Sequence, residues 1–285
     1  MASFFLLLLF KLAARLPLAV LHGIGGVMGR ITYMLSLGYA ARLRDNLNFA
    51  WAGHTPDAID AVRRACIAET GKSLAELPWV WQRPLHEVTA RVRDCHGWEH
   101  VEAARTQGRG IIFLTPHLGC FEVSALYAAE RLPITVLYRP PRIAWLEEVM
   151  RKGRMRGQVQ LARTDLSGVR MMFKALKRGE AIGLLPDQVP GQGEGEWADF
   201  FGRPAYTMTL VGRLAEGGAS VLMAYAERLP HGAGYTIRIT PLHFEQGQSA
   251  ARQMNAALEE VVRACPAQYL WSYNRYKIPA GVAAP

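Results

Sequence analysis

The sequence lacks the patterns that mark several common classes of protein. Its 285 residues include only four cysteines, and no two of them form a Cys-x-x-Cys pair. This spacing provides neither a disulfide framework nor a zinc motif, and it fits a reducing environment. The chain also has no P-loop, no Gly-x-Ser-x-Gly elbow and no His-Glu-x-x-His sequence. These absences argue against a P-loop nucleotidase, an ordinary serine lipase and a metalloprotease.

Acidic residues are scarce relative to basic ones. The chain has 33 Lys and Arg against 24 Asp and Glu, which gives a net charge of +9. Residues 1–44 contain five basic residues and no acid, and residues 139–178 contain eleven basic residues and three acids. Two such blocks indicate an anionic partner, which could be phospholipid, phosphate groups, an acidic carrier protein or nucleic acid. A solvated cationic face is the simpler alternative for either block.

The N-terminus lacks an uninterrupted apolar run of the length that spans a membrane, about 20 residues. Residues 4–10 are all apolar, but Lys11 follows, and Pro17 breaks the next apolar stretch. A charge near the middle of a spanning helix is costly. There is no basic segment before the apolar run and no small-residue cleavage site, which a signal peptide would have. We therefore expect residues 1–40 to form a membrane anchor or interfacial helical segment, with its cations facing the cytoplasmic leaflet. A spanning helix stays possible.

From residue 110 onward, short apolar runs alternate with helical patterns. We expect strands at 111–115, 134–138, 159–162, 181–185, 219–226 and 234–240, and helices at 118–131, 142–156, 166–178, 207–216 and 250–264. Residues 41–100 look helical, and residues 186–206 look like a long, functional loop. This alternation predicts an α/β domain over residues 41–285, with a mostly parallel core sheet flanked by helices.

The strongest candidate for chemistry is the sequence from Thr115 to Glu122, directly after the first of these strands. It contains His117 and Glu122, and such a pair suits proton transfer, because a carboxylate can fix the tautomer of an imidazole that acts as a base. Side chains five residues apart point roughly 140° apart in a regular helix. They can therefore meet only if His117 lies on the turn before the helix, which Pro116 favours. A capping histidine with an unrelated surface glutamate is the alternative.

Other polar residues follow predicted strands. Asp187 comes after 181–185, so it should share one edge of the sheet with His117, although a local turn aspartate is the alternative. Arg139 ends the strand at 134–138 and suits phosphate recognition, and Arg154 on the basic helix could do the same. Cys120, near a helix N-terminus, is a possible nucleophile.

Taken in order, these motifs resemble the bacterial lipid A late acyltransferases, the lauroyl and myristoyl transferases within the lysophospholipid acyltransferase-like superfamily. The resemblance covers nearly the whole chain. Its motifs are the N-terminal apolar segment, Arg44-Asp45-Asn46-Leu47, residues 110–122, Tyr138-Arg139-Pro140, Gly153-Arg154-Met155-Arg156, Leu185-Pro186-Asp187-Gln188 leading to Phe200-Phe201-Gly202, residues 268–271 and Arg275-Tyr276-Lys277.

The resemblance implies an enzyme on the cytoplasmic face of the inner membrane that moves a fatty acyl chain to a hydroxyl of a lipid A precursor. The donor would be acyl carrier protein or coenzyme A, with no metal and no further cofactor, and no nucleic acid would be involved. His117 would be the general base and Glu122 its orienting carboxylate. Arg139, Arg154 and Asp187 would line the substrate site. Either Arg139 or backbone N–H groups near Gly119 would stabilise the negative charge that develops during the transfer.

The sequence departs from the family at two points. Relatives often have Asn-Trp where this chain has Cys120-Phe121, and the wider glycerolipid acyltransferases usually have aspartate in place of Glu122. The glutamate points to the lipid A branch. A lysophospholipid or aminolipid acceptor, a membrane lipid hydrolase and a non-enzymatic basic protein that binds membranes or nucleic acid are the competing interpretations.

Overall fold

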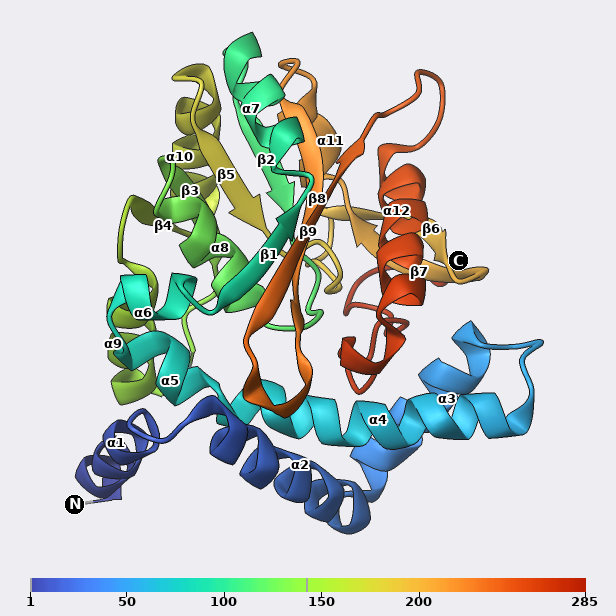
Figure 1. Cartoon of the computed structure of the whole chain (residues 1–285). Coiled ribbons are helices and arrows are strands. Elements are labelled where there is room, and N and C mark those ends of the chain that lie inside the picture. The colour runs from blue at the N-terminus through green and yellow to red at the C-terminus, as the bar shows by residue number, and fades with distance from the viewer. Residues whose placement is uncertain (1, 142) are drawn as a thin grey trace.

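A mostly parallel sheet of seven strands forms the centre of the molecule (Figure 1). The computed structural model describes residues 2–141 and 143–285, with side chains from residue 5 onward. In spatial order the strands are β1 (Val92–His96), β9 (Tyr235–Leu242), β8 (Ser220–Arg228), β2 (Ile111–Leu114), β5 (Ala181–Leu184), β3 (Ile134–Tyr138) and β4 (Val159–Arg163). Within this sheet β8 and β9 run antiparallel, and the other pairs are parallel. The predicted α/β class with a mostly parallel sheet is confirmed.

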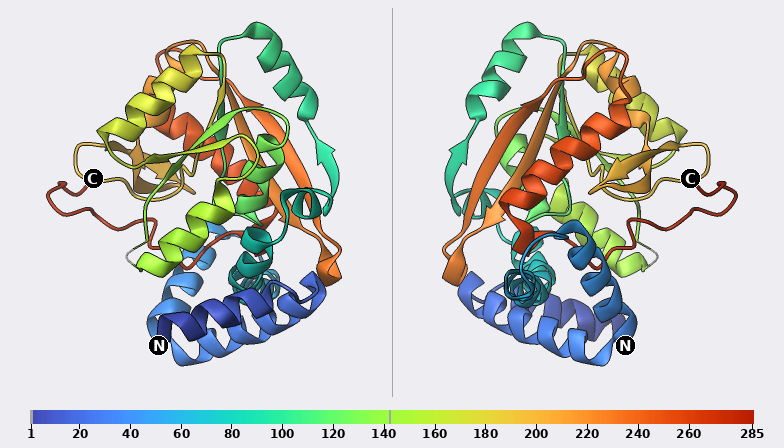
Figure 2. Two further views of the ribbon diagram at one scale, coloured as in Figure 1. Left: turned by 90° about the vertical axis from the view of Figure 1, so that its left-hand side faces the viewer. Right: turned by 90° about the vertical axis from the view of Figure 1, so that its right-hand side faces the viewer.

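Each central strand is buried on both faces, so its alternate side chains enter two separate cores. Ile112 and Ile182 pack on the side of α10 (Leu166–Lys177), α11 (Leu210–Ala215) and α12 (Ala250–Ala264). Phe113 and Val136 pack on the opposite side, against α7 (Trp98–Gln107), α8 (Phe121–Ala129) and α9 (Ala144–Arg154). Figure 2 shows helices on both faces of the sheet. Burial on two faces explains why these strands are continuous apolar runs in the sequence.

Two predictions about local structure are wrong. Residues 41–100 are not helical throughout, because they include β1, whose sequence Val-Arg-Asp-Cys-His is mostly exposed at the sheet edge and carries no apolar run. The region 186–206 is not a plain loop either. It includes β6 (Gly195–Phe200), which pairs with β7 (Arg203–Met208) in a separate antiparallel hairpin. Phe201 and Gly202 form the turn of this hairpin. Both have a positive φ, as the two central residues of a type I′ turn require.

Helices from the first 90 residues lie across one end of the sheet. They are α1 (Ala2–Ala13), α2 (Leu18–Leu35), α3 (Leu37–Ala50), α4 (Pro56–Ala75), α5 (Leu77–Gln82) and α6 (Leu85–Thr89). Pro17, which we expected to interrupt the apolar stretch, is the N-cap residue of α2. Within the described residues, α2 is the one helix long and apolar enough to cross a membrane.

Helices α2 and α4 approach each other very closely, as glycines permit. A Cβ added at Gly71 of α4 would lie 1.9 Å from the carbonyl oxygen of Gly25, and one added at Gly29 would lie 2.1 Å from that of Ile67. One side of α2 is therefore packed on α4, and its opposite side is exposed.

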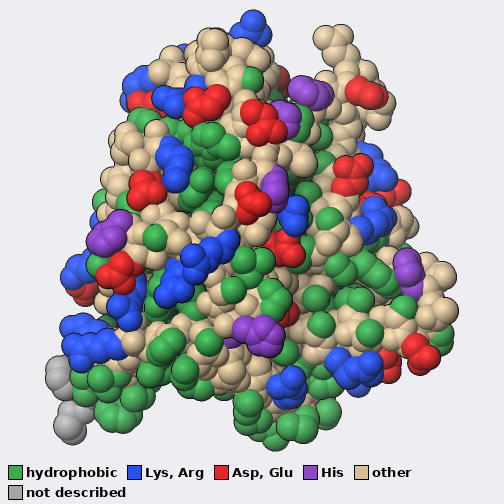
Figure 3. Space-filling view, in the orientation of Figure 1, with side chains coloured by type: hydrophobic (Ala, Val, Ile, Leu, Met, Phe, Trp, Pro, Cys, Tyr) green, Lys and Arg blue, Asp and Glu red, His purple; other side chains and the backbone are tan. Residues whose placement is uncertain are grey.

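That outer surface is apolar. Large apolar side chains are exposed along both α1 and α2, among them Leu9, Leu12, Ile24, Met28 and Leu35. In Figure 3 they gather along the lower edge of the molecule, over these two helices. Soluble monomers rarely expose a continuous apolar strip of this kind, so it marks a contact surface.

Candidate functional site

His117 and Asp187 meet at the carboxyl ends of two neighbouring strands. His117 follows β2, and Asp187 follows β5, which pairs with β2 in parallel register. The Nδ1 atom of His117 lies 2.8 Å from Oδ1 of Asp187, and the backbone N–H of His117 donates to Oδ2 at 2.9 Å. The expectation that both residues share one edge of the sheet is confirmed.

The carboxylate of Asp187 fixes the orientation of the imidazole. Burial acts to raise the pKa of Asp187, but the charge and the two hydrogen bonds of His117 outweigh it and hold that pKa below its ordinary value. An ionised Asp187 accepts a hydrogen bond from the Nδ1–H group, so the lone pair of the neutral ring lies on Nε2. Nε2 faces the side-chain amide of Gln188 at 3.2 Å, and the His117 side chain is 17% exposed. The imidazole of His117 can therefore accept a proton at Nε2.

Glu122 does not contact the imidazole in the way the sequence suggested. Its carboxylate forms an ion pair with Arg154 of α9, with Nε of Arg154 at 2.9 Å and 3.1 Å from the two oxygens. The expected contact between Glu122 and His117 is not formed in this structure, because Asp187 binds Nδ1 of the imidazole, and Glu122, in the first turn of α8, binds Arg154 instead. Burial acts to lower the pKa of Arg154, but the neighbouring Glu122 outweighs it and raises that pKa.

The backbone N–H groups near Gly119 are already used. His117 donates to Asp187, Leu118 to Pro116 O at 2.7 Å, Gly119 to Gln268 O at 3.1 Å, and Cys120 to Ala226 O at 2.8 Å. Because these donors are occupied within the chain, the expected anion site on them is not formed in this structure. Gly119 instead serves the loop itself, since its φ is +61° and a Cβ there would lie 2.0 Å from the oxygen of Ala226.

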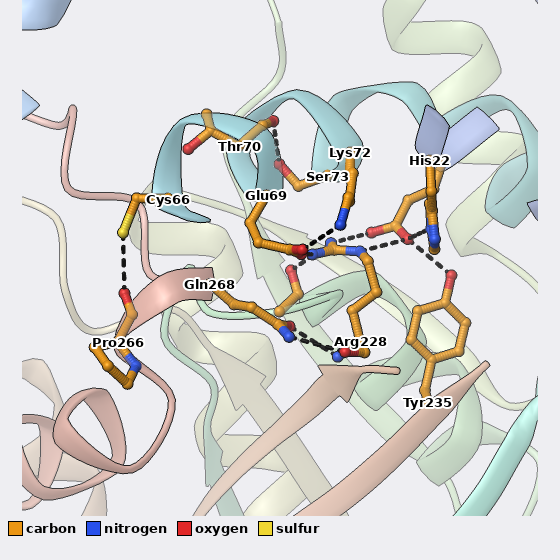
Figure 4. A network of polar contacts seen from close by, with 12 residues as sticks. His22, Cys66, Glu69, Thr70, Lys72, Ser73, Arg228, Tyr235, Pro266 and Gln268 are labelled. Carbon is orange, nitrogen blue, oxygen red and sulfur yellow. Dashed lines mark hydrogen bonds and ion pairs between the residues drawn. The ribbon is translucent and has the colours of Figure 1, made fainter. Parts of the chain in front are cut away.

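A buried polar network supports this loop from below (Figure 4). Arg228, at the end of β8, donates to the carbonyl of Gly119 at 3.2 Å, to Glu76 at 3.0 Å and to Glu69 at 2.8 Å. Glu76 also contacts His22 of α2 at 3.0 Å and accepts a hydrogen bond from the Tyr235 hydroxyl at 2.9 Å. The network thus connects an N-terminal helix with the loop that carries His117.

The two remaining candidates behave differently. Arg139 is exposed just beyond β3, on the same edge of the sheet as His117, and no ion pair joins it to another residue in the described part of the chain. Cys120 is buried, and burial, together with the nearby charge of Glu76, raises the pKa of its thiol well above the ordinary value. A thiol that stays protonated is a poor nucleophile.

An apolar cavity lies between α8 and the sheet. Its opening is lined by Thr115, Phe121, Glu122 and Arg154, and its walls come from six strands and from α8. The ring of Phe121 lies 5.0 Å from that of His117, measured between centroids. The cavity therefore begins beside the imidazole and continues into the core as a narrow apolar slot.

Three residues that build this site had no role in the sequence analysis: Arg228, which no motif included, and Gln188 and Gln268, which lie within motifs of the resemblance. Gln188 directly follows Asp187, so its position was a usable signal, whereas Arg228 and Gln268 come near only through folding. Within the described residues, no group of three His, Cys, Asp or Glu side chains is arranged to hold a metal ion.

The sequence matches the bacterial lipid A biosynthesis acyltransferase family over residues 1–278. It is 29% identical to the lipid A biosynthesis lauroyltransferase of Escherichia coli (strain K12), over 95% of this chain and 90% of that protein. The lipid A biosynthesis palmitoleoyltransferase of the same strain is 28% identical over 92% of this chain and 87% of its own length. The lipid A biosynthesis myristoyltransferase is 26% identical over 82% and 75%, respectively. Since the family match spans almost the whole chain, this protein belongs to the bacterial lipid A biosynthesis acyltransferases.

Proposed function

We propose that this acyltransferase moves a fatty acyl chain from acyl carrier protein to a hydroxyl of a lipid A precursor, with His117 as the general base. The observation that carries the proposal is the hydrogen bond between Nδ1 of His117 and Asp187, which leaves Nε2 as the basic nitrogen. A positioned imidazole of this kind accepts a proton from a hydroxyl near neutral pH.

The reaction would proceed by direct transfer. Nε2 of His117 removes the proton of the acceptor hydroxyl as its oxygen attacks the thioester carbonyl, which forms the new C–O bond. The tetrahedral intermediate then collapses, the C–S bond breaks, and the leaving thiolate takes the proton back from the imidazolium. Gln188, which now faces Nε2 at 3.2 Å, would give way to the acceptor hydroxyl.

Arg154 would stabilise the negative charge of the intermediate. It lies at the opening of the cavity, and its bonds to Glu122 use Nε and Nη2. Nη1 is the remaining terminus of the guanidinium and would point to the oxyanion. In this proposal Glu122 acts as a positioning residue for Arg154, because a carboxylate that binds two guanidinium nitrogens fixes the plane of the group.

Cations on the outer faces of the two basic helices would receive the anionic partners. Arg151, Arg170, Lys174 and Lys177 are exposed on α9 and α10. Acyl carrier protein is the acidic partner that fits such a surface, and Arg139 at the sheet edge would bind a phosphate of the acceptor.

The apolar strip on α1 and α2 would lie in the cytoplasmic leaflet of the inner membrane. Because α2 packs along α4 through glycines, it is held against the body of the protein, which favours an interfacial helix over a separate spanning one. Residues 1–40 would thus act as the anchor and 41–285 as the catalytic unit.

The test uses purified enzyme in detergent with lauroyl- or myristoyl-acyl carrier protein and a four-chain lipid A precursor. We expect the lipid to gain the mass of one acyl chain, and His117→Ala to lower the rate by about 10² to 10⁴. Parallel reactions with acyl-coenzyme A, with a lysophospholipid and without an acceptor test the donor, the acceptor and hydrolysis. A wild-type rate in His117→Ala would refute the role of the histidine.

A further inference from the structure

Gly183 lies in the floor of the apolar cavity, at the centre of the sheet. In the register of β5 it sits beside Phe113 of β2 on one side and Val136 of β3 on the other. Its φ is not positive, so the backbone conformation does not require a glycine. A Cβ at this position would contact Ile134 and Val136 at 3.5 Å, which is ordinary van der Waals distance. The backbone could therefore carry a side chain here, and what the glycine provides is open space in the cavity.

The opposite wall of the cavity is also made of small residues. Ser124, Ala125 and Ala128 of α8 line it. The Ser124 hydroxyl is buried and has no hydrogen-bond partner among the described residues. An acyl chain cannot form a hydrogen bond with this hydroxyl, so this wall favours an apolar ligand only through the small size of its residues, which leaves room in the slot.

The floor becomes bulky one step further from the opening. Ile134 and Val159 also line the cavity. Ile134 lies two residues before Val136 on β3, and Val159 is its partner on the neighbouring strand β4. An apolar chain that enters beside Phe121 thus passes from an open region at Gly183 to a region closed by branched side chains.

We propose that Gly183 sets the length of the acyl chain that this enzyme transfers. The inference rests on the proposed acyl transfer from a thioester near His117. The chain lies in the cavity between α8 and the sheet, passes over Gly183 and ends against Ile134 and Val159. A side chain at position 183 occupies the volume of the last methylenes, and a smaller residue at position 159 creates room for more.

The experiment is a competition among acyl carrier proteins that carry even-numbered chains from decanoyl to palmitoyl, with mass analysis of the lipid product. Gly183→Ala is expected to move the preference toward shorter chains, and Gly183→Val to move it further. We compare kcat/KM for the longest chain that wild type accepts with kcat/KM for a chain two carbons shorter. In the Gly183 variants we expect this ratio to fall by about 10-fold or more. Val159→Ala is expected to move the preference in the opposite direction.

Ile182→Val is the matched control, because it alters the same strand on the opposite face of the sheet. It is expected to leave the chain-length profile unchanged. A chain-length profile of Gly183→Ala that is identical to that of wild type would overturn the inference. So would an equal loss of kcat/KM with all donors. Failure of the wild type to acylate the lipid at all would instead count against the proposed function, so the two failures are distinguishable.

Discussion

Nη2 of Arg228 donates a hydrogen bond of 3.2 Å to the backbone carbonyl of Gly119, two residues beyond His117. The same guanidinium binds Glu76 and Glu69, and its side chain is almost fully buried. The position of the His117 loop is therefore tied to a buried ion-pair network, and through Glu76 to His22 of α2.

Arg228→Lys should yield a folded protein with a lower rate. Lysine keeps the charge near Glu76, but a single ammonium cannot reproduce the planar set of donors that reaches Gly119, Glu76 and Glu69 together. We expect kcat to fall by about 10- to 100-fold, since small misplacements of reacting groups have effects of this size. Steady-state kinetics would measure it, with thermal unfolding as the check on folding. A variant with the wild-type kcat would show that the bond to Gly119 is not needed.

Substitutions at Asp187 and Glu122 should have different effects on the histidine. Asp187→Asn removes the anion that holds the Nδ1 proton of His117, and we expect kcat to fall by about 10² to 10⁴. Glu122→Gln should also lower kcat, through Arg154, but leave the imidazole in place.

Proton NMR of the Nδ1–H resonance of His117 separates these two effects. The resonance should disappear in Asp187→Asn and persist in Glu122→Gln. Loss of the signal in both variants would mean that Glu122 supports the imidazole after all.

The core of the fold was predictable because its strands are buried on both faces. Runs such as Ile111–Leu114 and Ala181–Leu184 have no polar residue, and they alternate with helical segments, so the parallel sheet follows from the sequence. The edge strand β1 and the hairpin β6–β7 carry no such signal. The residues of β1 are mostly exposed, and β1 pairs with β9, which lies far away in the sequence. The hairpin pairs locally, but the residues of β6 are partly exposed and polar and form no continuous apolar run.

The site was predictable only in part, for a related reason. His117 and Asp187 both follow buried strands, and the rule that such positions share one edge of a parallel sheet brought them together. The spacing between His117 and Glu122 suggested a direct contact, but spacing does not reveal Arg154, which reaches Glu122 from 32 residues away. Nor does the spacing show that the backbone N–H of Gly119 donates a hydrogen bond to the carbonyl of Gln268.

Replacement of Cys120 should leave the reaction intact. Its thiol is buried, and burial raises its pKa, so the thiolate that a covalent mechanism requires does not form at neutral pH. We expect Cys120→Ala to retain acyl transfer, and intact-protein mass spectrometry of wild type with donor alone to detect no acyl adduct. An acyl group on Cys120 that passes to the lipid would establish a two-step mechanism instead.

The network around Glu76 should make the protein sensitive to acid. Burial acts to raise the pKa of Glu76, but Arg228 and His22 outweigh it and lower the pKa from 4.5 to about 2. A carboxyl whose pKa is depressed in the folded state stabilises that state above its unfolded pKa, and the contribution is lost as the pH falls through the folded pKa. We therefore expect the stabilising effect of Glu76 to decline between pH 4.5 and about 2.

Denaturant unfolding of wild type and Glu76→Gln at several pH values would measure this contribution. Near neutral pH the variant should be less stable by about 3–5 kcal/mol, because it leaves Arg228 buried without its main partner. The difference should shrink as the pH falls below 4.5. A difference that is constant down to pH 2 would contradict the assigned charge state.

Charges on the outer face of α2 should weaken membrane binding without harming the fold. Met28 and Leu35 are 55% and 80% exposed and lie seven residues apart on this helix. In the double variant Met28→Glu and Leu35→Glu, the new carboxylates would have to enter the interfacial region beside anionic lipid, which is unfavourable. We expect binding to vesicles that contain phosphatidylglycerol to fall by at least about 10-fold, measured by co-sedimentation.

The matched control is Leu166→Glu with Phe173→Glu on α10, which has the same spacing and charge and also replaces exposed apolar residues. Because α10 covers the sheet and α2 lies across its end, the control should bind vesicles as wild type does. An equal loss in both variants would mean that net charge alone governs binding, and that the apolar strip on α1 and α2 is not the membrane contact.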